Sequence, residues 1–300
     1  MVLLEQVSKF IIKDLNLHIP KGEIVGIIGA SGAGKTTLLK LISGLLESET
    51  GSVHTLRMDP IRDRKKLVGE IGTLFADKAV LDMESPVREN LENAGVIYGI
   101  KKEEFEERYQ KLSKTLGFEA YETELPVKLS LGQRRRAELA FVFLPETKIL
   151  CLDEPCIGLD QLGKKAVMEL ALDKKKNKTT VLISSHDMEE IDHMCDRILL
   201  IHQGKKIFYG PKEELLRRFA PVDVLQMDYT GDIPSLADLP IEWYDIENGH
   251  LEMAYDSNHV TAKEVLEILS EKEGIKNISI RHARLEDTIR TIMKAEASQN

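Results

Sequence analysis

Two glycines separated by four residues and followed by lysine and threonine form a motif that can hold phosphate, Gly29-Ala30-Ser31-Gly32-Ala33-Gly34-Lys35-Thr36. Glycines let consecutive backbone N–H groups turn inward around anionic oxygens, and a helix that begins there adds its positive N-terminus. In such a loop Lys35 reaches the β- and γ-phosphates, and the Thr36 hydroxyl binds Mg²⁺. The alternative is a tight strand-to-helix turn, but the strand before the motif and the helix after it also match. The motif predicts that a nucleoside triphosphate binds here.

Two carboxylates end a second buried run, Ile149-Leu150-Cys151-Leu152-Asp153-Glu154. Ligands of α/β sheets bind at the carboxyl ends of the strands. Asp153 suits the coordination shell of Mg²⁺, and Glu154 is placed to polarise a water that attacks the γ-phosphate. One acid there could be a helix cap, but two acids with a phosphate loop upstream favour the catalytic interpretation.

Two further segments carry weak signals when each is taken alone. Leu129-Ser130-Leu131-Gly132-Gln133 is typical of a helix N-terminus with a serine cap. His186, in Ser184-Ser185-His186-Asp187, follows a buried strand, where a histidine is usually a capping or packed residue. Only the order of these segments along the chain gives them a further meaning.

The elements that must position these residues form an alternating series. Buried apolar runs recur at Glu23 to Ile28, Lys148 to Leu152, Thr180 to Ser184 and Ile198 to His202. Helical patterns separate them, at Lys35 to Leu45, Gln161 to Lys174 and Asp187 to Cys195. The repetition of strand, helix and strand predicts a mainly parallel α/β sheet.

Other segments predict additions to this sheet. Val7 to Ile19 alternates apolar and polar residues and predicts an antiparallel strand, so we expect a β subdomain at the N-terminus. Between about residues 77 and 143 helix formers dominate, which predicts a helical insertion. Its charged run is expected to be a solvated face with pairs such as Glu104 with Arg108.

A small α+β domain is expected after a boundary at Ala220-Pro221, so that domain 1–220 precedes domain 221–300. Asn248-Gly249 predicts a hairpin turn within it. The remaining expected elements are strands at Asp223 to Tyr229, Ile241 to Ile246, Leu251 to Tyr255 and Ile275 to Ile280, and helices at Thr261 to Lys272 and Leu285 to Ala295.

Composition restricts the class of protein. The chain has 300 residues, which suggests about two globular units, and its 42% apolar content excludes wholesale disorder. Lys and Arg number 41 against 50 Asp and Glu, and the net charge of −9 disfavours nucleic acid as a partner. The longest uncharged apolar stretches, such as Ile24 to Ala30, are far shorter than the ~20 residues of a membrane span. With an early Glu5, no basic start and three cysteines, the sequence predicts a cytoplasmic protein.

Taken together and in this order, the motifs resemble those of the ATP-binding cassette (ABC) ATPases over roughly residues 1 to 215. Within that pattern Gly29 to Thr37 is similar to the Walker A loop, Leu129 to Gln133 to the signature loop and Leu150 to Asp153 to the Walker B strand. Gly158-Leu159-Asp160 is similar to the D-loop, and the His186 segment to the switch histidine. The resemblance implies ATP and Mg²⁺ as ligands, and contacts from Thr37, Ser130, Leu131, Gly132, Gln133 and Asp160 to the nucleotide.

The resemblance also implies partners. Two cassettes face head to tail, each ATP lies between the phosphate loop of one and the signature loop of the other, and His186 contacts the γ-phosphate. A homodimer on the cytoplasmic face of the membrane, joined to a separate permease, is therefore expected. The arginines after Gln133, the segment from Ser185 to Glu190 and Leu285-Glu286-Asp287 resemble daunorubicin-type multidrug exporters. The alternative is a soluble or regulatory cassette with weak ATPase activity and a non-transport partner.

Two positions depart from the family pattern. After Ile71 to Phe75 the family has a glutamine that helps to coordinate Mg²⁺, and this chain has Ala76-Asp77. Either Asp77 substitutes as an oxygen ligand or coordination there is lost. Phe10 is the nearby aromatic residue that could stack on adenine, but it could equally be a packed core residue.

Overall fold

The computed structural model describes residues 1–219, 222–230, 241–257, 259–270 and 274–298. The chain divides into two compact units, Met1–Tyr209 and Gly210–Asn300. This division precedes the expected boundary at Ala220-Pro221, which lies outside the described residues. No helix in the described part of the chain has the length and apolar character of a bilayer span.

An antiparallel sheet opens the first unit, with strand order β2-β1-β4. The prediction of one strand from Val7 to Ile19 is wrong, because Lys9 pairs with Ile12 and the chain reverses at Phe10, which has a φ of 52°. The alternation of apolar residues continues across this turn, and no glycine or proline marks it. The strands are β1 (Val2–Lys9), β2 (Ile12–Ile19) and β4 (Thr50–Thr55).

The second sheet of this unit has the order β5-β6-β7-β3-β8-β9, and its pairs from β5 to β8 are parallel. Every residue of β3, β6 and β7 is buried, as the continuous apolar runs predict. The strands are β3 (Ile24–Ile28), β5 (Ile71–Leu74), β6 (Ile149–Asp153), β7 (Thr180–Ser184), β8 (Arg197–His202) and β9 (Lys205–Pro211).

Helices α6 (Gln161–Lys176) and α7 (Met188–Met194) connect strands of this sheet, and α1 (Lys35–Ile42) leads from β3 to β4. Leu38, Leu39, Leu41 and Ile42 of α1 join one apolar core with side chains of both sheets. Burial of this helix face fixes where α1 begins relative to the end of β3, so the core positions the phosphate loop between them.

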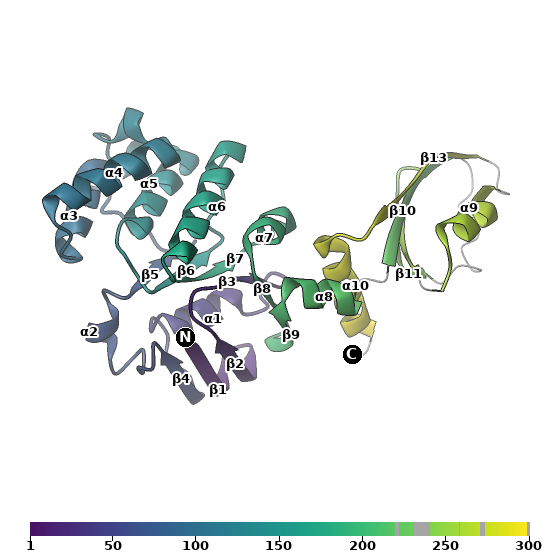
Figure 1. The fold of residues 1–300 in the computed structure, drawn as a ribbon, viewed down its shortest axis with the longest axis horizontal. Helices are drawn as coiled ribbons and strands as arrows, with labels where there is room; N and C mark the ends of the chain where they lie inside the picture. Colours follow the sequence, from purple (N-terminus) through teal and green to yellow (C-terminus); the bar gives the residue numbers. More distant parts are fainter. Residues whose placement is uncertain (220–221, 231–240, 258, 271–273, 299–300) are drawn as a thin grey trace. The chain divides into compact units, whose positions relative to one another are not determined.

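The chain between β5 and β6 contains three α-helices, α3 (Val87–Ile97), α4 (Lys102–Leu116) and α5 (Leu131–Phe143). Figure 1 shows these helices grouped beside α6, apart from the three-stranded sheet. The expected pair of Glu104 with Arg108 is present on α4. Short elements flank the group, namely α2 (Arg64–Leu67), η1 (Glu119–Tyr121) and η2 (Pro126–Lys128).

An antiparallel sheet with strand order β11-β12-β10-β13 forms the centre of the second unit. Glu247 pairs with His250 around Asn248-Gly249, which confirms the predicted hairpin turn. The helix predicted up to Lys272 is α9, and residues 271–273 lie outside the described part. The elements are α8 (Lys212–Phe219), β10 (Val222–Tyr229), β11 (Ile241–Glu247), β12 (His250–Asp256), α9 (Ala262–Ser270), β13 (Ile275–His282) and α10 (Leu285–Ser298).

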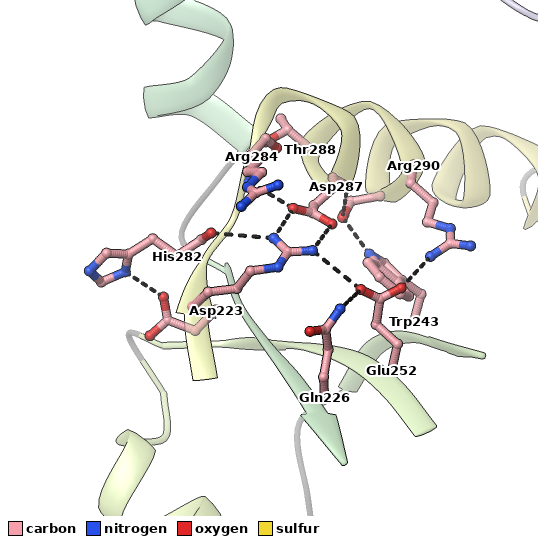
Figure 2. A network of polar contacts seen from close by, with 11 residues as sticks. Asp223, Gln226, Trp243, Glu252, His282, Arg284, Asp287, Thr288 and Arg290 are labelled. Carbon is pink, nitrogen blue, oxygen red and sulfur yellow. Dashed lines mark hydrogen bonds and ion pairs between the residues drawn. The ribbon is translucent and has the colours of Figure 1, made fainter. Parts of the chain in front are cut away.

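The helices α9 and α10 are held to this sheet by different forces. Val265 and Leu269 of α9 belong to an apolar cluster with buried side chains of β10 and β12. By contrast, α10 is tied to the strands by the polar network in Figure 2, in which Glu252 accepts hydrogen bonds from Gln226 (2.8 Å) and Arg290 (3.3 Å). The docking of α10 therefore depends on charge as well as on apolar area.

Candidate functional site

The phosphate loop requires its first and last glycines for different reasons. A Cβ atom on Gly29 would lie 2.2 Å from the carbonyl oxygen of Ile201 in β8, so no larger residue fits against that strand. Gly34 caps α1 with a φ of 109°, a conformation that L side chains rarely adopt. The glycine spacing thus follows from the packing of the loop between β3, β8 and α1.

Lys35 closes this loop. Its ammonium donates to the carbonyl oxygens of Gly29 (2.7 Å) and Ala30 (3.2 Å). Burial lowers the pKa of Lys35, while the negative charges of Glu154 and Asp153 act in the opposite direction. Anionic phosphate oxygens beside the ammonium would favour its charged form further.

A chain of hydrogen bonds joins α1 to the ends of β6 and β7. The Thr36 hydroxyl donates to Asp153 Oδ2 at 2.8 Å, and the Ser184 hydroxyl donates to Asp153 Oδ1 at 2.6 Å. Ser184 was not predicted as a site residue, although it ends the strand that pairs with Asp153 and is the first residue of the Ser184 to Asp187 segment. The hydroxyl and carboxylate are hard oxygen donors, so this pair fits the preference of Mg²⁺.

Glu154 directly follows this chain and faces His186. Its Oε1 lies 3.0 Å from His186 Nε2, and its Oε2 accepts from the His186 backbone N–H at 3.3 Å. The backbone of Glu154 has a φ of 48° and is held there by N–H bonds to Ser184 O (3.1 Å) and Oγ (3.0 Å). Such a conformation costs about 1–3 kcal/mol and persists only where its surroundings enforce it. The turn therefore fixes the direction of the carboxylate.

The electrostatic environment of Glu154 suits a group that handles protons. Burial raises the pKa of its carboxyl group, and the nearby His186 and Lys35 oppose that rise. A carboxylate with a raised pKa is a stronger base than an exposed one.

These residues line one cleft of about 250 Å³. It brings together most of the phosphate loop with the acids and the histidine that the sequence singled out. Two of its residues, Ile11 and Ala76, were not anticipated; each is adjacent in sequence to a residue that was, Phe10 and Asp77 respectively. The lining residues are Ile11, Ser31, Gly32, Ala33, Gly34, Lys35, Thr36, Thr37, Ala76, Asp153, Glu154 and His186.

The segment Ser130 to Gln133 does not line this cleft. Ser130 caps α5, and its side chain and that of Gln133 satisfy each other's backbone N–H groups. A Cβ atom on Gly132 would lie 2.7 Å from the carbonyl oxygen of Gly158, so the two turns lie in contact. Leu131 is 55% exposed. The segment therefore contributes no side chain to the lining of the chain's own cleft.

Asp160 has two local roles. Its carboxylate accepts from the Gly163 N–H at 2.7 Å as the cap of α6, and it pairs with Arg136 at 2.5 Å. Arg135 pairs with Glu138 at 3.2 Å. Two of the three arginines after Gln133, Arg135 and Arg136, are therefore salt-bridged within this unit.

Asp77 and Phe10 are not brought to the cleft. The Asp77 carboxylate pairs with Lys40 at 2.6 Å, and this hydrogen bond is the main reason why its pKa lies below the ordinary value. Phe10 is 62% exposed, with the Lys9 ammonium 5.0 Å from its ring centre, so it is not a core residue. The neighbour of Phe10, Ile11, lines the cleft in its place.

Comparisons with known proteins agree with this geometry. A family model described as ABC transporter matches residues 12–157. The ABC transporter ATP-binding protein NatA of Bacillus subtilis is 35% identical over 204 residues, which cover 68% of this chain and 83% of that protein. The chain belongs to the ABC transporter ATP-binding proteins.

Further relatives extend over the same region. The energy-coupling factor transporter ATP-binding protein EcfA of Methanocaldococcus jannaschii is 32% identical to this chain. The alignment covers 78% of this chain and 87% of EcfA. A solved ATP-binding subunit of an ABC transporter superposes with a TM-score of 0.68 at 25% identity, over 73% of this chain and 92% of its own. The dimeric bacterial ABC transporter cassette MJ0796 superposes with a TM-score of 0.64 at 26% identity. The superposition covers 70% of this chain and 98% of the MJ0796 chain.

Family membership defines the activity of the first unit. As an ABC cassette the chain binds ATP and is an ATPase. Its fold is that of the family, with an antiparallel β subdomain beside a mainly parallel α/β sheet.

Proposed function

We propose that this chain energises an ABC exporter by hydrolysing MgATP in the cleft around Lys35 and Glu154. The observation that carries the proposal is the convergence, at one sheet edge, of the Thr36–Asp153 hydrogen bond and the Glu154–His186 contact. In this assignment Lys35 and the N–H groups from Gly29 to Thr37 hold the β- and γ-phosphates. Glu154 polarises the attacking water, because its half-buried carboxylate is the fixed base beside them.

Thr36 and Asp153 are the proposed Mg²⁺ ligands. Asp153 is 4% exposed and already accepts two hydroxyl hydrogen bonds, so its oxygens are oriented without a ligand. Mg²⁺ there would neutralise charge that develops on the β- and γ-phosphate oxygens. Asp77 remains a candidate for a third oxygen ligand, which requires release from Lys40. An unchanged ATPase rate in both Asp77→Ala and Asp77→Gln would remove it from that role.

We propose that the working unit is a homodimer in which Ser130 to Gln133 of one copy cover the nucleotide of the other. Three observations support this arrangement. Ser130 to Gln133 do not line their own cleft, the helix N-terminus behind Ser130 suits a γ-phosphate, and Leu131, Ile157 and Leu162 are exposed by 55%, 46% and 73%. Asp160 contributes to the same contact from the neighbouring turn.

Analytical ultracentrifugation with a non-hydrolysable ATP analogue tests the homodimer. The wild-type chain should sediment as a dimer with analogue and Mg²⁺ and as a monomer without them. Ser130→Arg should remain monomeric while it still binds the analogue. A Ser130→Arg chain that dimerises as the wild type does would contradict the arrangement.

We propose that the dimer acts at the cytoplasmic face of the membrane on a separate permease. The similarity of the arginines after Gln133, the Ser185 to Glu190 segment and Leu285-Glu286-Asp287 to daunorubicin-type cassettes supports export. In the ATP-bound state we expect the adenine ring to lie beside the turn that carries Phe10 and Ile11, with Phe10 as the residue that stacks on it. Capture of the tagged chain from membranes of its source organism should recover one polytopic membrane protein in stoichiometric amount. Recovery of a ribosome or a regulatory protein instead would favour the non-transport alternative.

A further inference from the structure

The loop that carries His186 is held by contacts whose other end lies in α6. His186 follows the last residue pair of β7 and precedes α7, so it belongs to neither element. Its imidazole is 58% exposed and therefore gains little orientation from packing. Apart from the two contacts of His186 with Glu154, the hydrogen bonds of its neighbours Ser185 and Asp187 hold this loop.

Those neighbours are bonded to one another and to a buried acid. Asp187 N–H donates to Ser185 Oγ at 3.0 Å, and Ser185 Oγ donates to Glu190 Oε2 at 2.9 Å. Asp187 also caps α7 by accepting from the N–H groups of Glu189 and Glu190. All of these bonds are internal to residues 185–190, so they shape the loop without anchoring it to the rest of the unit.

Lys164 of α6 anchors Asp187 and Glu190 to the rest of the unit. Its ammonium lies 2.5 Å from Asp187 Oδ2 and 3.1 Å from Glu190 Oε1. Glu190 is 4% exposed, and a carboxylate so buried is stable only beside a cation or strong donors. The hydrogen bonds that Lys164 donates to Asp187 and Glu190 raise its pKa, so the ammonium keeps its charge.

We propose that Lys164 is a positioning residue for hydrolysis, which holds the His186 loop against Glu154 through Asp187 and Glu190. The inference rests on the proposed roles of Glu154 and His186. It goes beyond them because Lys164 is not among the residues that line the cleft. Lys164 lies in the first turn of α6, and Asp160 is the N-cap of that helix. The same helix therefore connects the Asp160 turn to the His186 loop.

The test compares Lys164→Met with Lys165→Met, the adjacent exposed lysine of α6. A misplacement of about 1 Å can cost about a hundredfold in turnover, so we expect kcat of Lys164→Met to fall by at least about tenfold. KM for ATP should stay within about twofold, because the phosphate loop is untouched. Lys164→Arg should retain most of kcat, and Lys165→Met should be unchanged. Lys164→Gln replaces the methionine variant if thermal melting shows that the latter does not fold.

A second readout follows His186 itself. The ring resonance of His186, assigned by its loss in His186→Ala, should shift in Lys164→Met and not in Lys165→Met. A normal kcat in Lys164→Met, or a lowered kcat with an unshifted resonance, would overturn the inference. The two proposals fail differently. Normal turnover in His186→Ala removes the role of His186, whereas an inactive His186→Ala beside a normal Lys164→Met removes only that of Lys164.

Discussion

Replacing Asp287 with asparagine should loosen α10 from the sheet of the second unit. The Asp287 carboxylate is 6% exposed and accepts from both guanidinium nitrogens of Arg281, at 2.5 and 3.1 Å, and from the Arg284 N–H at 2.7 Å. Asparagine keeps the size of the side chain but loses the charge and turns an amide NH₂ toward these donors. The substitution thus removes charge-assisted bonds without creating a cavity.

The expected loss of unfolding free energy is about 2–3 kcal/mol. Removal of one partner of a buried ion pair costs about 3–5 kcal/mol. The cost here is lower, because Arg281 is 28% exposed and keeps Glu252 at 3.2 Å. Burial would raise the pKa of Asp287, but Arg281 and the Arg284 N–H hold it below its ordinary value of 3.8. A lowered carboxyl pKa stabilises the fold above the unfolded value, so the difference between variant and wild type should shrink as the pH falls below 3.8.

Trp243, the single tryptophan of the chain, provides the assay. Its indole N–H donates to Thr291 of α10 at 3.1 Å, and the Arg290 guanidinium lies 4.3 Å from its ring centre, so its fluorescence senses the docking of α10. Urea unfolding of Asp287→Asn, followed by this fluorescence, should show a lower midpoint than wild type. Asp245→Asn is the matched control, since Asp245 pairs with Arg290 but is 47% exposed and should cost less than about 1 kcal/mol. Equal costs for the two variants would refute the reasoning.

Two further outcomes are expected at the nucleotide site. Because burial raises the pKa of Glu154, the acid limb of kcat/KM against pH should have its midpoint above 4.5, and a midpoint at or below that value would contradict the role given to burial. Gly132→Ala places a Cβ atom 2.7 Å from the Gly158 carbonyl oxygen, so ATP turnover should fall by roughly tenfold. Gly69→Ala, where no atom lies within 4 Å, should leave turnover unchanged in the same steady-state assay.

The alternation of buried strands and helices could be predicted from the sequence because one physical pattern marks it. A strand covered on both faces is mostly apolar, as are Ile24–Ile28 and the centre of Thr180–Ser184. The hairpin at Asn248-Gly249 could also be predicted, because its turn needs two residues that accept positive φ and asparagine and glycine do so. The turn at Phe10 also requires a positive φ, but it contains no glycine or asparagine. The alternating apolar pattern therefore gave no sign of this turn.

Within the site, the sequence indicated residue types better than their partners. Lys35, Thr36, Asp153 and Glu154 could be assigned from local spacing, because each lies at the end of a buried strand or the start of a helix. Partners that come from distant segments carry no local signal. The bonds of Asp153 with Ser184, of Asp77 with Lys40 and of Asp187 with Lys164 exist only once the sheet and helices are assembled.

ATP turnover by Glu154→Gln tests the central claim most directly. The glutamine keeps the shape of the side chain but cannot act as a base toward water. With ATP and Mg²⁺, the variant should show steady-state hydrolysis reduced by at least a hundredfold, the low end expected for loss of a general base. It should also retain intact ATP in a stable dimer. Hydrolysis at the wild-type rate would contradict the account, because the water would then be activated elsewhere.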